Sequence, residues 1–159
     1  MCDKKHYAQL DRRRIISATY CSKIRSKGGA CYAGDHFHPL SLHIHFCGYP
    51  KTSVAAPWDG GFVWSEDDYH RPWVGMACEG IGPSSWLPCK DHWSDEAEQM
   101  DMHLEVPATL QGISNGRLLS TQTLDSNWQS YNWHVASPIN GYNISVNVGA
   151  YTHLSDTFY

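Results

Sequence analysis

The chain has 159 residues and a mass of 18.0 kDa, a length that suits one domain. Apolar residues make up 42% and charged residues 18% of the sequence, which excludes a disordered tail, a coiled coil and a collagen-like chain. No apolar run approaches the roughly 18 residues that a membrane helix needs, so we expect no membrane partner.

The charge is distributed unevenly, although the net charge is only −4. Residues 1–34 contain eight of the twelve Lys and Arg but two of the sixteen Asp and Glu. The run Arg12-Arg13-Arg14 could contact nucleic acid. We favour a solvated terminus, because the acidic remainder of the chain would repel phosphate. We therefore expect a basic N-terminal segment over residues 1–33, one domain over residues 34–159, and no nucleic-acid partner.

Alternating apolar and polar residues predict strands along most of the chain after residue 35. In chain order, the predicted strands lie around residues 42–46, 73–78, 100–106, 119–123, 131–135 and 142–148. Asn115-Gly116 is a strong tight-turn signal. Only Ser94–Met100 could hold a helical turn, and a loop suits that region equally well. Short strands separated by polar turns predict an all-β fold, an antiparallel sandwich or bowl.

Histidine pairs raise the question of a metal site. His36-x-His38 and His43-x-His45 each place two imidazoles on one strand face, a spacing that zinc can use. A third ligand is not evident, and the sequence contains no H-E-x-x-H. We favour histidines on a wet sheet face, and we expect no metal ligand and no cofactor in this chain.

Aromatic and acidic clusters also have two interpretations. Trp58, Trp64, Trp73 and Trp86 lie close together in the sequence and could stack on sugar rings if they were exposed. We favour packing in the core, because tryptophan is usually largely buried. The acidic run over residues 66–68 lacks the spacing of a calcium loop, and we expect a solvated turn there.

Three segments are the most informative in the chain: residues 56–64 (APWDGGFVW), 76–82 (MACEGIG) and 86–92 (WLPCKDH). Their order and spacing resemble the N-terminal β-domain of the zinc aminopeptidases related to aminopeptidase N and the leukotriene hydrolases, most closely the bacterial branch. The likeness covers roughly residues 41–159. Pro83 and Leu87 stand where that branch more usually has Ala and Trp.

The resemblance implies that the chain is a partial domain. The family's catalytic domain, with its H-E-x-x-H motif, would follow Tyr159. Zinc would belong to that missing domain, which would also be a partner of this chain. We expect the chain alone to be inactive and to contribute no catalytic residue. The alternative is a non-catalytic β-sandwich that binds carbohydrate or a protein partner.

The resemblance also points to one loop. In the family, the residue that matches Glu79 helps bind the free α-amino group of a peptide substrate, and Cys78 and Gly80 flank it here. A carboxylate and an ammonium group form a charge-assisted hydrogen bond. Fixing the amino terminus at a set distance from the zinc restricts cleavage to the first residue. The structural alternative is an exposed loop carboxylate in a local salt bridge.

Overall fold

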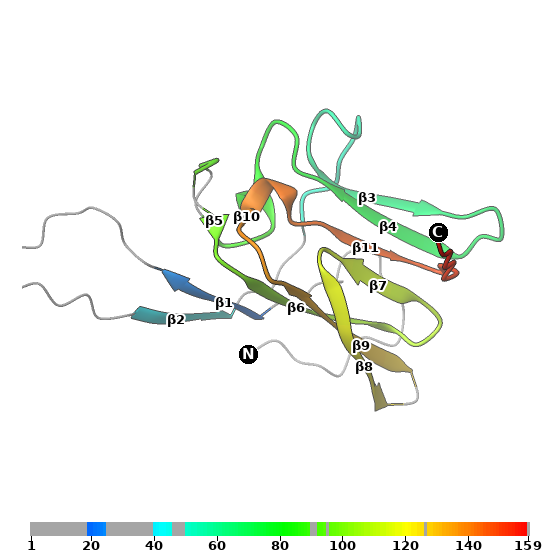
Figure 1. Cartoon of the computed structure of the whole chain (residues 1–159). Coiled ribbons are helices and arrows are strands. Elements are labelled where there is room, and N and C mark those ends of the chain that lie inside the picture. Colours follow the sequence, from blue (N-terminus) through cyan, green and yellow to red (C-terminus); the bar gives the residue numbers. More distant parts are fainter. Residues whose placement is uncertain are drawn as a thin grey trace, which may run out of the picture.

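The structure is a computed structural model that describes residues 19–24, 40–45, 50–89, 92–94, 96–125 and 127–158. His36, His38, Phe46 and the basic run 12–14 lie outside these ranges. Within them the protein is all-β, as predicted, and every named strand pairs antiparallel with its neighbours (Figure 1).

Two larger sheets form the body of the protein. The four-stranded sheet has the order β3 (Gly61–Glu66), β4 (Pro72–Ala77), β11 (Val146–Gly149), β7 (Gln111–Ser114). The three-stranded sheet has the order β6 (Met100–Pro107), β9 (Trp128–Val135), β8 (Arg117–Asp125). Two ribbons complete the fold: β1 (Thr19–Ile24) with β2 (Leu40–His45), and β5 (Glu96–Ala97) with β10 (Ile139–Asn140).

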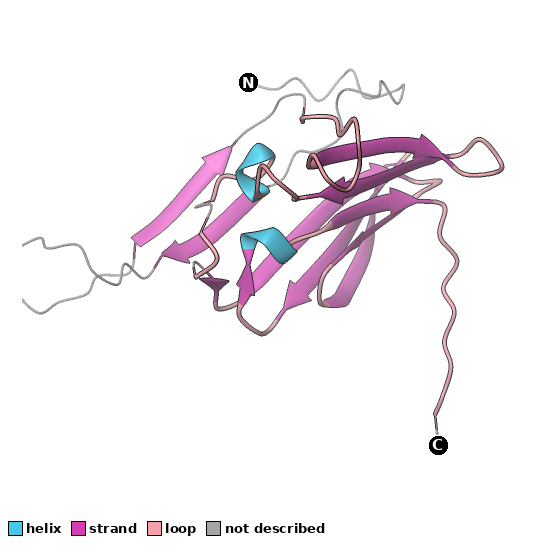
Figure 2. Cartoon of the chain, turned by 90° about the horizontal axis from the view of Figure 1, so that it is seen from above, coloured by secondary structure: helices cyan, strands magenta, loops and turns pink. Residues whose placement is uncertain are grey.

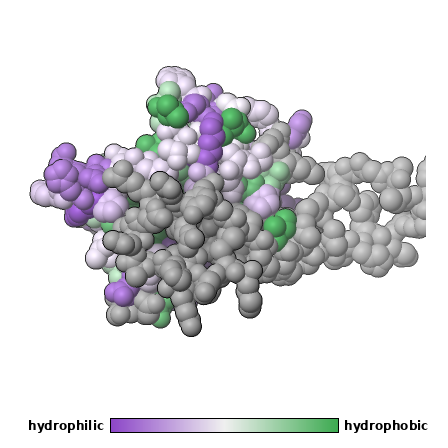
Figure 3. Space-filling view, turned by 180° about the vertical axis from the view of Figure 1, so that it is seen from behind, coloured by the Kyte–Doolittle hydropathy of each residue, from purple (hydrophilic) through white to green (hydrophobic). Residues whose placement is uncertain are grey.

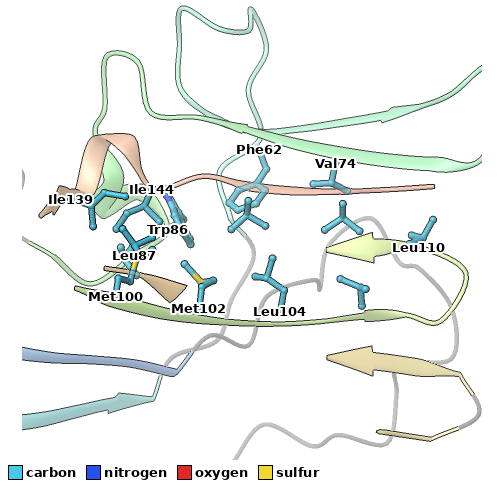
Figure 4. Packing of buried hydrophobic residues seen from close by; sticks show 14 residues of the cluster. Phe62, Val74, Trp86, Leu87, Met100, Met102, Leu104, Leu110, Ile139 and Ile144 are labelled. Carbon is cyan, nitrogen blue, oxygen red and sulfur yellow. The ribbon is translucent and has the colours of Figure 1, made fainter. Parts of the chain in front are cut away.

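The core lies between the two larger sheets (Figure 4). Residues of β6 alternate strictly between buried and exposed, as the sequence pattern predicts for a strand with one wet face. Buried side chains of the opposite sheet complete a sandwich-like core. Its members are Phe62, Val74, Trp86, Leu87, Met100, Met102, Leu104, Val106, Leu110, Val135, Ile139, Ile144, Val146 and Val148.

One sequence prediction about local structure was wrong, and one open alternative was decided. The predicted strand over 142–148 begins only at Val146, because Gly141–Asn143 forms a 3₁₀ turn, η3. The Asn140 side chain caps that turn by accepting a hydrogen bond from the Asn143 N–H at 3.1 Å. For Ser94–Met100 the sequence left a helical turn and a loop open, and the described residues there include the short strand β5 and no helical turn. A second 3₁₀ turn, η2, covers Pro83–Ser85 instead and lies near η3 (Figure 2).

The predicted turns match the structure. Gly116 follows β7 with φ of +85°, a conformation that glycine adopts at little cost, and β8 begins at the next residue. The acidic run forms the solvated β3–β4 turn. There Asp67 accepts the Tyr69 and Arg71 backbone N–H groups at 2.9 Å and pairs with the Arg71 guanidinium at 2.6 Å.

Large apolar side chains that remain exposed in the described ranges are mostly on loops, on the edge strand β8 and near the C-terminus. Figure 3 shows one face of the protein, on which hydrophobic residues form separate small patches. None of the helical segments in the described ranges has the length or the apolar character that a bilayer span requires.

Candidate functional site

The loop that carries Glu79 leaves the four-stranded sheet at the end of β4. Cys78 is buried, and the chain then turns through Glu79 and Gly80, with the Gly82 N–H donating to the Cys78 carbonyl at 3.0 Å. Gly80 has φ of +76° and Gly82 of +73°, so glycine at both positions permits the turn. The tight turn leaves the Glu79 side chain exposed.

A neighbouring loop supports this turn from one side. At Gly60 the backbone approaches the Glu79 carbonyl so closely that an added Cβ would lie 2.3 Å from its oxygen. Asp59 holds that loop by accepting hydrogen bonds from the Ser53 hydroxyl and, at 2.6 Å, from the Val54 N–H. The Ser53 bond, followed by the Val54 bond, lowers the pKa of Asp59 to about 2.

Tyr142 reaches Glu79 from the other side. The Tyr142 hydroxyl donates to Oε2 of Glu79 at 2.5 Å, although the two residues are 63 positions apart in the sequence. The indole of Trp93 stacks on the Tyr142 ring, with 5.1 Å between ring centroids and an interplanar angle of 25°. Trp93 is itself 72% exposed, so its outer face is open to solvent.

These residues line a cleft of about 290 Å³. Glu79 is the one carboxylate among the described lining residues, and no Lys or Arg is among them. The complete lining set is Cys78, Glu79, Gly80, Gly82, Pro83, His92, Trp93, Asn140, Gly141 and Tyr142. A carboxylate beside aromatic rings suits an organic cation, which gains a charge-assisted hydrogen bond and contact with π faces.

The structure places the predicted residues Cys78, Glu79 and Gly80 together in this cleft. Sequence reasoning missed Tyr142 and Trp93, and it assigned Tyr142 to a strand. No local signal pairs Tyr142 with Glu79, because their contact depends on how the sheet and η3 pack. The Tyr142 hydroxyl occupies one carboxylate oxygen of Glu79.

The tryptophans and histidines that the sequence singled out lie in different surroundings. Trp86 is 8% exposed and belongs to the core, whereas Trp58 is 76% exposed on the loop before β3. Trp64 and Trp73 are half-buried. The backbone of His43 and His45 lies in β2, and their predicted role on a wet face stays a prediction. Across the described ranges, no three His, Cys, Asp or Glu side chains form a group that could hold a metal ion.

We expect the Glu79→Ala variant to have a lower Tyr142 pKa than the wild type. The hydrogen bond to Glu79 is the largest cause that raises the pKa of Tyr142, because ionised tyrosine cannot donate to the carboxylate. Because the Tyr142 pKa is higher in the folded than in the unfolded chain, the hydrogen bond stabilises the fold fully below the ordinary tyrosine pKa of about 10. This stabilisation is lost as the pH rises through the pKa of folded Tyr142. NMR titration of the tyrosine ¹³Cζ signals measures the Tyr142 pKa in both proteins.

Tyr131 is the internal control for this titration. Burial alone raises the pKa of Tyr131, so Glu79→Ala should leave its titration unchanged. An unaltered Tyr142 titration in Glu79→Ala would show that the hydrogen bond does not form in solution.

No protein-family model matches this sequence, and no curated protein matches it at a significant level. Solved structures do match the fold. The M1 zinc metallopeptidase from Deinococcus radiodurans superimposes with a TM-score of 0.54 at 17% identity, over 86% of this chain and 32% of that one. A mutant two-domain M1 zinc metallopeptidase bound to L-arginine gives a TM-score of 0.55 at 18% identity with the same coverage.

A further match is a mutant M1 zinc metallopeptidase from D. radiodurans bound to a Tyr-Ser-Ala substrate, with a TM-score of 0.55 at 18% identity. The match covers 86% of this chain and 32% of that one. The chain thus has the fold of a region that makes up about a third of these metallopeptidases.

Proposed function

We propose that residues 34–159 are the cleft-forming β-domain of a zinc aminopeptidase, of the bacterial branch that the sequence resembles, and that residues 1–33 are a separate basic segment. In this proposal Glu79, flanked by Cys78 and Gly80, binds the α-ammonium group of a peptide. The observation that carries the proposal is the exposed Glu79 carboxylate in the lining of a cleft whose described lining residues include no Lys or Arg. The fold shared with M1 zinc metallopeptidases supports it.

The role of this chain is to bind and orient the peptide. Glu79 accepts a hydrogen bond from the ammonium group, and the aromatic rings beside it offer π faces to the same cation. A peptide fixed by its first nitrogen presents its first amide bond at a constant distance from the anchor. An enzyme built on this domain would therefore release single residues from the amino terminus.

The described residues do not fit a zinc ion, since they contain no suitable ligand group. The proposal accordingly assigns zinc and the water-activating carboxylate to a catalytic domain of the parent protein, which would be the partner of this chain. We expect the purified 159-residue chain to hydrolyse no aminoacyl reporter substrate, with or without added zinc. Turnover by pure protein that a chelator abolishes would contradict this expectation.

We expect the chain to bind Tyr-Ser-Ala more tightly than N-acetyl-Tyr-Ser-Ala by about fivefold, because acetylation removes the ammonium charge. The exposure of Glu79 keeps the factor at this modest size. Shifts of the backbone amide signals of residues 78–82 in ¹⁵N NMR titrations give both Kd values.

The same titrations on Glu79→Ala test the assignment. The ratio of the two Kd values should fall to about one in this variant, and raising the salt concentration should reduce the wild-type ratio. A Glu79→Ala variant that keeps the wild-type ratio would show that Glu79 is an ordinary surface carboxylate.

A second candidate function rests on the two tryptophans that are largely exposed, Trp58 and Trp93. Exposed indoles can stack on sugar rings, which would suit a carbohydrate-binding module. Such a module would bind oligosaccharides and would show no preference for a free amino terminus. Titration with both peptides and with a panel of neutral oligosaccharides therefore separates the two functions.

A further inference from the structure

The two oxygens of the Glu79 carboxylate have different surroundings. Oε2 accepts the Tyr142 hydroxyl at 2.5 Å. Within the described part of the chain, no hydrogen bond or ion pair reaches Oε1. One oxygen is thus tied to the protein, and the other remains available to a ligand in the cleft that Glu79 lines.

Tyr142 is fixed by three separate features. The η3 turn that carries it is capped by Asn140. Gly141 packs against Pro83 so closely that an added Cβ would lie 2.8 Å from the Pro83 Cγ. The Trp93 indole stacks on the Tyr142 ring. The hydroxyl is therefore held at a constant place relative to the Glu79 loop.

We propose that Tyr142 is a positioning residue of the cleft: it holds Oε2 of Glu79 so that Oε1 is the acceptor for the ammonium group of a ligand. This inference rests on the proposed function, because it concerns how Glu79 binds that ammonium group. Trp93 contributes by holding the Tyr142 ring and needs no contact with the ligand.

The physical reason is preorganisation. A glutamate on an exposed loop samples many rotamers, and a ligand that needs one of them must restrict the side chain when it binds. The Tyr142 hydrogen bond restricts the Glu79 side chain when the protein folds, so the ligand does not have to restrict it on binding. Tyrosine also suits the role because the hydrogen bond to Glu79 raises its pKa, so the hydroxyl remains a donor at neutral pH.

The test uses the 159-residue chain and the Tyr-Ser-Ala and N-acetyl-Tyr-Ser-Ala probes. Tyr142→Phe keeps the ring and removes only the hydroxyl, and we expect it to lower the ratio of the two Kd values from about fivefold to about twofold. Trp93→Ala should have a smaller effect of the same sign. Both variants should stay folded with only slightly lower Tm values, since Tyr142 is partly exposed and Trp93 is 72% exposed.

Tyr69→Phe is the matched control. Tyr69 is 79% exposed in the β3–β4 turn, away from the cleft residues, so this variant should keep the fivefold ratio. The Kd ratio also separates positioning from a purely structural role, because distortion of the cleft would weaken binding of both peptides alike.

Each outcome has a defined meaning. Loss of the ratio in both Glu79→Ala and Tyr142→Phe supports the inference. Loss in Glu79→Ala with the full ratio retained in Tyr142→Phe overturns the inference and leaves the proposed function standing. Equal weakening of both peptides in Tyr142→Phe also overturns it. A ratio retained in Glu79→Ala overturns the proposed function itself.

Discussion

A Phe62→Ala variant is expected to lose about 3–5 kcal/mol of its free energy of unfolding. Phe62 is 1% exposed on β3, and its ring meets the Trp86 ring edge-on at 6.0 Å between centroids. The Trp64 ring is also near the Phe62 ring, with 6.2 Å between centroids. Removing the ring leaves a cavity between the two sheets that these rigid aromatic neighbours cannot fill. Urea denaturation followed by tryptophan fluorescence measures the loss.

Val54→Ala is the control for this experiment. Val54 is 93% exposed on the loop before β3, and its truncation should change the free energy of unfolding by less than about 0.5 kcal/mol. Equal unfolding free energies for Phe62→Ala and Val54→Ala would show that the sheets do not pack on Phe62 as described.

A Gly60→Ala variant is expected to lose about 2–4 kcal/mol of its free energy of unfolding and most of its discrimination between Tyr-Ser-Ala and the acetylated peptide. Gly60 has φ of +61°, which strains any residue with a Cβ. Its added Cβ would also lie 2.3 Å from the Glu79 carbonyl oxygen and 2.7 Å from the Ile81 Cγ1. The backbone of the Glu79 loop would have to move, and the carboxylate would move with it.

The Gly80→Ala variant distinguishes the effect of the steric clash at position 60 from the effect of a positive φ alone. Gly80 has a similar φ of +76°, but the one atom near its added Cβ is the Trp58 carbonyl oxygen at 3.4 Å. This variant should therefore lose only about 1 kcal/mol from the left-handed conformation. Denaturation curves and the two peptide Kd values should be measured for both variants. Similar losses in the two would contradict the close packing of the loops.

The sequence was most informative where burial depends on local alternation. The strand around β6 was predicted correctly, because the face of each residue follows from its position in the strand. The strand around β4 was also predicted, although its burial does not alternate. The turn at Gly116 was predictable for the same reason, since the need for positive φ is local. The all-β class follows from these elements together.

Features that depend on distant contacts were not predictable. Tyr142 continues an apolar alternation, yet the Asn140 cap places it in a 3₁₀ turn. Trp58 and Trp86 look alike in sequence, but one is exposed and the other lies in the core. The Glu79 loop could be located from its motif, whereas its partner Tyr142 became visible only once the sheet order was known.

The sheet order also has a consequence for the time course of folding during synthesis. β11 lies between β4 and β7 in the four-stranded sheet, although it is the last strand in the chain. At about 5–20 residues per second, a ribosome needs several seconds to make the roughly 70 residues between β4 and β11. Throughout that interval β4 has an open edge that can pair with other chains. The contact between Tyr142 and Glu79 thus forms late in the synthesis of these residues, since Tyr142 precedes β11 by only a few residues.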